Sequence, residues 1–121
     1  MTAISQASKH FSIKLLDLKK GIEYCGDAED YTDALITYRD SIEERSRKLE
    51  DDMASDDIEA FTIDIHSLKS MSRAAGATSL ADRAAELEAA AKAGELDKIK
   101  AGLPGFLEDY RSLLPLLNDA I

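Results

Sequence analysis

The chain has 121 residues, with 15 Lys and Arg against 24 Asp and Glu, which gives a formal net charge of -9. This length predicts one domain with a core large enough to fold without disulfides or metals. The negative charge argues against a nucleic-acid partner and against an anionic membrane surface, because both carry phosphates that would repel the protein. No apolar run approaches the roughly 20 residues of a membrane span, and no signal-peptide pattern follows Met1. Because the single cysteine, Cys25, suits a reducing compartment, we expect a cytoplasmic protein.

The spacing of apolar residues predicts an all-α fold. Val is absent, whereas apolar residues recur at steps of three and four in segments rich in Ala, Leu, Glu and Lys. Residues 1–12 have the character of a tail or linker remnant, and residues 13–121 form the helical domain. A short first helix is expected over residues 13–24, with Gly26 as its C-terminal cap. One of its stripes comprises Ile13, Leu16, Lys20 and Tyr24.

Four longer helices are predicted over residues 27–53, 56–75, 79–93 and 95–118. The short connections between them favour antiparallel neighbours, and therefore an up-down-up-down four-helix bundle whose one end is covered by the short first helix. Each long helix has a stripe of residues expected to face the core. These stripes are Tyr31, Leu35, Tyr38, Ile42, Arg45, Leu49 and Asp52; Ile58, Phe61, Ile65, Leu68, Ser72 and Ala75; Leu80, Ala84, Leu87 and Ala91; and Leu96, Ile99, Leu103, Phe106, Tyr110, Leu113 and Leu117.

Polar residues and glycines mark the expected helix ends. Asp27 is predicted to cap the second helix, and Asp56 with Glu59 three residues later resembles a capping box for the third. Thr78 or Ser79 is predicted to cap the fourth helix. Because proline lacks an amide hydrogen and clashes with the preceding turn, Pro104 predicts a kink or a split in the last helix.

His66 is the residue most suggestive of chemistry. It follows Ile65 of the buried stripe, and at about 100° per residue its side chain points away from the core. Its neighbours on that side of the helix are cations and small hydroxyl residues: Thr62, Lys69, Ser70 and Arg73. A local cationic strip beside a nucleophilic side chain suits a bound or covalent phosphoryl group. The alternative is an ordinary surface histidine.

Other kinds of site have little support. A di-metal site in a helical bundle needs Glu three residues before His, but Ala7 and Ile63 precede His10 and His66 at that spacing. Phosphate-binding loops, dinucleotide fingerprints and haem-attachment motifs are absent. Spacing alone does not exclude a Ser–His–Asp arrangement, but no nucleophile-elbow sequence supports one.

The run His66-Ser67-Leu68-Lys69-Ser70-Met71-Ser72, followed by Gly76-Ala77 and Leu80, resembles the signature of histidine-containing phosphotransfer (HPt) domains. Leu87-Glu88 supplies the Leu-Glu pair that follows one helix later in that family. The opening segment, with Gly21-Ile22, Cys25-Gly26-Asp27 and Tyr31, is also similar. The resemblance extends over about residues 13 to 118. It departs from the family at Ser70, where glycine is usual.

The resemblance implies a phosphorelay carrier rather than an enzyme with its own kinase activity. His66 would accept a phosphoryl group from a receiver-domain aspartate and pass it to another receiver. Lys69 would stabilise the charge of the phosphate, and Ser70 would leave room for the partner or donate to the phosphate. Thr62 and Arg73 would contact the partner.

The expected partners are response-regulator receiver domains and a hybrid histidine kinase, with the chain itself a monomer. No cofactor is expected on this chain, and Mg²⁺ is expected on the receiver. The competing hypothesis is an acidic helical interaction module in which His66 has no chemical role.

Overall fold

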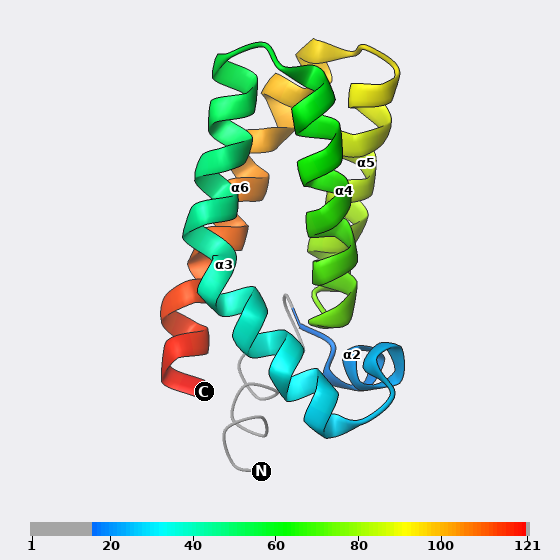
Figure 1. Ribbon diagram of the computed structural model, residues 1–121, viewed down its shortest axis with the longest axis vertical. Coiled ribbons are helices and arrows are strands. Elements are labelled where there is room, and N and C mark those ends of the chain that lie inside the picture. The colour runs from blue at the N-terminus through cyan, green and yellow to red at the C-terminus, as the bar shows by residue number, and fades with distance from the viewer. Residues whose placement is uncertain (1–15, 121) are drawn as a thin grey trace.

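The computed structural model describes residues 16–120, and all regular secondary structure in this range is α-helical, with no strand, as predicted (Figure 1). The predicted tail, residues 1–12, and residues 13–15 of the predicted first helix lie outside the described residues. None of the described helices is long and apolar enough to cross a membrane. The elements are α2 (Leu18–Cys25), α3 (Ala28–Ala54), α4 (Ile58–Ala74), α5 (Thr78–Lys92) and α6 (Leu96–Ala120).

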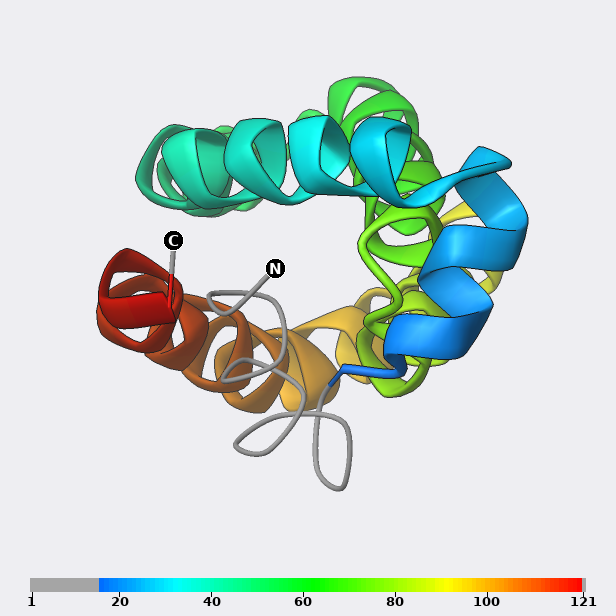
Figure 2. The same cartoon turned by 90° about the horizontal axis from the view of Figure 1, so that it is seen from below.

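The four long helices form the predicted antiparallel bundle. In Figure 1, α3 and α5 run upward while α4 and α6 run downward. Each helix packs against its neighbours in the chain, and contacts between α3 and α6 close the ring. The short helix α2 contacts α3 and α4, and lies across the lower end of the bundle (Figure 2).

The core consists of the predicted apolar stripes. Tyr38 and Tyr110 meet edge to face at its centre, with ring centroids 5.4 Å apart. Phe106 stacks beside Tyr110 at 6.1 Å. The largest fully buried side chains all belong to the predicted stripes: Tyr31, Tyr38, Tyr110, Phe61, Phe106, Leu35, Ile42, Leu49, Ile65, Leu68 and Leu80. Burial of these side chains supplies the main driving force for folding.

Two predicted stripes are wrong in detail. Ser46, not Arg45, is the buried residue between Ile42 and Leu49, because a turn of 3.6 residues moves the stripe one position along. Arg45 is half-buried instead and donates to the Ser67 hydroxyl at 3.2 Å. The stripe expected at Lys20 and Tyr24 does not form, since both residues are exposed.

Three helix starts also differ from the sequence prediction. Helix α2 begins at Leu18 because the Asp17 carboxylate accepts from the Lys20 amide and caps it there. Asp57, not Asp56, caps α4 by accepting from the Ala60 amide at 3.1 Å. Asp56 instead takes a left-handed backbone conformation, with a φ of 55°.

Helix α5 has no side-chain cap. Its N-cap residue is Ala77 rather than Thr78 or Ser79. The Thr78 hydroxyl donates backward to the carbonyl of Gly76 at 3.3 Å, and no side-chain hydrogen bond caps the first turn of the helix.

Helix α6 runs through both prolines without the expected split. Pro104 and Pro115 lie within a helix that continues from Leu96 to Ala120. Both are solvent-exposed, while Leu103, Phe106 and Leu107 beside Pro104 are buried. The buried side of the helix therefore keeps its packing even though each proline removes one backbone donor.

Gly76 lies in the short turn between α4 and α5, at the lower end of the bundle. Its φ is +77°, and a Cβ at this position would overlap the carbonyl of Asp17. Its own carbonyl accepts from the Asp17 amide at 2.6 Å, and the Tyr31 hydroxyl donates to the neighbouring carbonyl of Ala75 at 2.7 Å. This close approach needs glycine, and it fixes the position at which α2 crosses α4.

Candidate functional site

The imidazole of His66 lies on the outside of the bundle. Its side chain is 59% exposed, whereas Phe61, Ile65 and Leu68 on the opposite side of α4 are completely buried. The amphipathic pattern of α4 therefore leaves this histidine accessible from solvent without opening the core.

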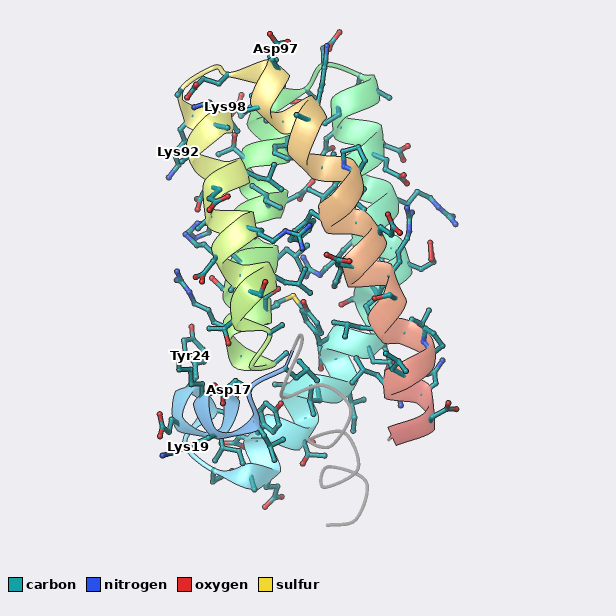
Figure 3. The ribbon with its side chains drawn as sticks, turned by 180° about the vertical axis from the view of Figure 1, so that it is seen from behind. Asp17, Lys19, Tyr24, Lys92, Asp97 and Lys98 are labelled. Atoms are coloured by element: carbon teal, nitrogen blue, oxygen red, sulfur yellow. The ribbon has the colours of Figure 1, made fainter. Side chains whose placement is uncertain are left out.

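A buried glutamate on the next helix holds the His66 ring. Nδ1 of His66 lies 2.6 Å from Oε2 of Glu88, and Nζ of Lys69 lies 2.6 Å from the other carboxylate oxygen. Nζ of Lys92, one turn further along α5, lies 3.3 Å from Oε2. Figure 3 shows Lys92 projecting from the outer edge of α5. Glu88 is itself only 5% exposed, so α4 and α5 together build the site.

The three partners keep Glu88 ionised. Burial opposes ionisation, but hydrogen bonds from Lys69, His66 and Lys92 outweigh it and lower the pKa of Glu88 to about 2. An ionised carboxylate can only accept hydrogen bonds, so this contact assigns the proton of a neutral His66 ring to Nδ1. Nε2 then keeps its lone pair and is the nitrogen of the exposed ring that is able to act as a nucleophile.

The other predicted site residues lie on the same side of α4. Thr62 is half-buried, and its hydroxyl donates to the carbonyl of Ile58 at 2.7 Å. The Ser70 hydroxyl donates to the carbonyl of His66 at 3.4 Å, and Arg73 is exposed. Lys69 is only 16% exposed in its side chain, because it turns toward Glu88. Lys69 and His66 are thus linked through Glu88, which contacts both.

Asp64, two residues before His66, belongs to a different environment. Its Oδ2 lies 3.5 Å from Nζ of Lys48 on α3. Its neighbour Asp52 on α3 is 7% exposed, and burial together with the hydrogen bond and charge of Asp64 raises the pKa of Asp52. This carboxyl pair lies between α3 and α4, whereas the His66 ring is turned toward α5.

A protein-family model described as the Hpt domain matches residues 33–120, more than two thirds of the chain. The chain belongs to the Hpt domain family. The match confirms the resemblance drawn from the sequence, and it begins inside α3, so α2 lies outside it. Hpt domains are histidine-containing carriers of two-component phosphorelays and are not kinases. Comparisons with curated proteins and with solved structures returned no match.

Glu88 belongs to the Leu-Glu pair of the family motif, but the sequence predicts no role for its side chain. A signal was available, because Glu88 directly follows Leu87 in a stripe of otherwise small and apolar residues. A carboxylate at the edge of a buried stripe needs a cationic or hydrogen-bonding partner. The partner could not be identified from one helix, because it depends on how α4 and α5 are aligned.

Proposed function

We propose that this Hpt domain carries a phosphoryl group on Nε2 of His66, accepts it from the aspartyl phosphate of one receiver domain and passes it to the aspartate of another. The single observation that supports this most is the exposed imidazole whose Nδ1 is held by the buried Glu88 carboxylate. This hydrogen bond fixes both the tautomer and the ring orientation before a partner arrives.

In the transfer step, the Nε2 lone pair forms a bond to phosphorus while the bond between phosphorus and the aspartate oxygen breaks. The aspartate leaves as a carboxylate, and the phosphorylated ring, still protonated at Nδ1, takes on positive charge. Glu88 lies 2.6 Å from that nitrogen and offsets this charge. The reverse sequence returns the phosphoryl group to a receiver.

The receiver is expected to bring Mg²⁺ and the acceptor carboxylate, and the metal ion would neutralise charge on the equatorial phosphoryl oxygens. On this chain, Lys69 is the nearest cation in sequence, and it holds Glu88 at 2.6 Å in the unphosphorylated domain. We assign to Lys69 the main role of neutralising the Glu88 carboxylate, and the secondary role of neutralising the phosphoryl group. Thr62, Ser70 and Arg73 are the proposed partner contacts around the ring.

Replacement of the phosphoacceptor tests this function. His66→Gln should abolish labelling by a phosphorylated receiver, with unchanged helical circular dichroism, because the side chain lies outside the core. His10→Gln is the matched control and should keep full labelling. The wild-type product should be labile in acid and stable in alkali. Phosphate retained on His66→Gln would contradict the assignment, and an unlabelled wild type would favour the acidic interaction module.

A further inference from the structure

The outer side of α6 carries charged residues in an ordered pattern around Pro104. Lys100 lies four residues before Pro104, and Glu108 lies four residues after it. Asp97 and Arg111 lie on the same two sides, each seven residues from Pro104. At about 100° per residue, all four charged positions fall within about 40° of Pro104 around the helix. These five residues therefore form one stripe, the α6 stripe, along which the charges alternate in sign.

The charges of the α6 stripe are complementary to themselves. When a second α6 lies antiparallel to the first and crosses it at Pro104, each Lys100 faces the Glu108 of the other copy. Each Asp97 then faces the Arg111 of the other copy. A parallel second helix in the same register would instead place each charge beside an identical one. Because every contact in a two-fold interface occurs twice, the stripe offers each of these ion pairs twice to a second copy of itself.

Most of the charges on the α6 stripe have no partner within the chain. The side chains of Asp97, Lys100 and Glu108 are exposed and form no ion pair or hydrogen bond among the described residues. Arg111 donates to Glu50 of α3 at 2.8 Å, but its side chain remains 34% exposed. A single molecule therefore leaves the stripe unsatisfied, and a second copy supplies the missing opposite charges.

An apolar groove of about 440 Å³ lies beside the stripe, between α3 and α6. Its apolar lining consists of Met53, Leu103, Pro104 and Leu107, and its charged lining of two cations and two carboxylates. The groove therefore has no net formal charge, whereas the whole chain carries -9. Two copies of an acidic protein repel each other least where both surfaces are locally neutral. Apolar surface in the groove also gains free energy when it is covered.

We infer that the α6 stripe is a self-association surface, on which a second copy of this chain binds antiparallel about a two-fold axis at Pro104. An interface built mainly from one helix of each copy is small, so the dimer is weak and depends on concentration. This differs from the monomer expected from the sequence. In Figure 1, α3 and α6 lie on one side of the bundle and α4 and α5 on the other. His66, which turns toward α5, therefore stays accessible in both copies.

Charge reversal tests the pairing, because each substitution changes two symmetric contacts. Sedimentation equilibrium from about 10 µM to about 1 mM, in about 0.15 M salt, should show a monomer–dimer equilibrium for the wild type. Lys100→Glu and Glu108→Lys each place like charges opposite one another, and each should lower the association constant at least about tenfold. Lys19→Glu on α2 is the matched control, since it changes the net charge as Lys100→Glu does but should leave the association constant within about twofold.

Mixing the two single variants provides the sharpest result. An equal mixture of Lys100→Glu and Glu108→Lys should form dimers as the wild type does, because each copy then supplies the opposite charge at both contacts. The double variant that carries both substitutions should also dimerise by itself. A wild type that stays monomeric at every concentration would overturn the inference, and so would single variants that dimerise like the wild type. A mixture that fails to associate would refute the antiparallel pairing.

Discussion

Replacement of Glu88 by glutamine measures what the buried carboxylate contributes to stability. The amide has the same shape but no charge, so it cannot neutralise the Lys69 ammonium group, which lies 2.6 Å from the Glu88 carboxylate. Lowering the pKa of Glu88 from 4.5 to about 2 corresponds to about 3 kcal/mol in favour of the ionised, folded form. Glu88→Gln should therefore lower the free energy of unfolding at pH 7 by about 3 kcal/mol.

The lowered pKa of Glu88 also predicts how this difference in stability depends on pH. Because the folded pKa lies below the ordinary value of 4.5, the stabilisation is fully present above that pH and is lost as the pH falls through about 2. At pH 3 the difference between Glu88→Gln and the wild type should shrink to about 1 kcal/mol. Urea unfolding of both proteins at pH 7 and pH 3, followed by circular dichroism, measures both values.

Two outcomes would refute this reasoning about Glu88. Equal destabilisation at both pH values would mean that the glutamine disturbs packing rather than charge. Equal stability of the two proteins at pH 7 would mean that desolvation of the carboxylate cancels its three partners. Lys98→Gln is a suitable control for removal of a surface charge, since Lys98 forms an exposed pair with Glu95 and should change stability by well under 1 kcal/mol.

Three further predictions concern the core, the second carboxyl pair and the partner face. Phe61→Ala should cost about 3–5 kcal/mol in thermal or urea unfolding, because the ring is completely buried. Burial and the neighbouring Asp64 raise the pKa of Asp52, so the stability that Asp52 contributes is present at acid pH and lost as the pH rises past neutrality. Asp52→Asn should therefore be more stable than the wild type at pH 8 but not at pH 4 in unfolding titrations. Ser70→Gly should keep phosphotransfer and lose about 1 kcal/mol of stability, whereas Ser70→Tyr should block transfer from receivers but not labelling by phosphoramidate.

The helices and the core could be predicted because their signals are local and repeated. Apolar residues every three or four positions define the inner side of each helix over many turns, so one odd residue shifts a stripe without moving the helix. The misplacement of Arg45 and Ser46 is such a shift. Helix starts are less predictable, because neighbouring polar residues can compete for the capping position, as at α4, or all fail to occupy it, as at α5. Asp57 accepts from the Ala60 amide while Asp56 turns left-handed, and composition does not distinguish these two aspartates.

Only those features of the site that depend on a single helix could be predicted from the sequence. The outward direction of His66 and its neighbours on α4 follow from spacing of 100° per residue. The contacts of Glu88 with His66 and Lys69 depend on how α5 is aligned along α4, and no pattern within either helix determines this alignment. The same limit applies to Asp52 and Asp64, which are twelve residues apart in the sequence and meet across the α3–α4 interface.

A carboxylate beside a phosphohistidine presents a difficulty, because a basic carboxylate could activate water and hydrolyse the phosphoryl group. Glu88 is poorly suited to that reaction. General bases work best when their pKa lies near the working pH, and a carboxylate with a pKa of about 2 binds a proton weakly at pH 7. Its two oxygens are also engaged by Lys69 and His66. The cations that hold Glu88 in place therefore also reduce its basicity, so that in the proposed phosphorylated state it would orient the ring and offset its charge without promoting hydrolysis.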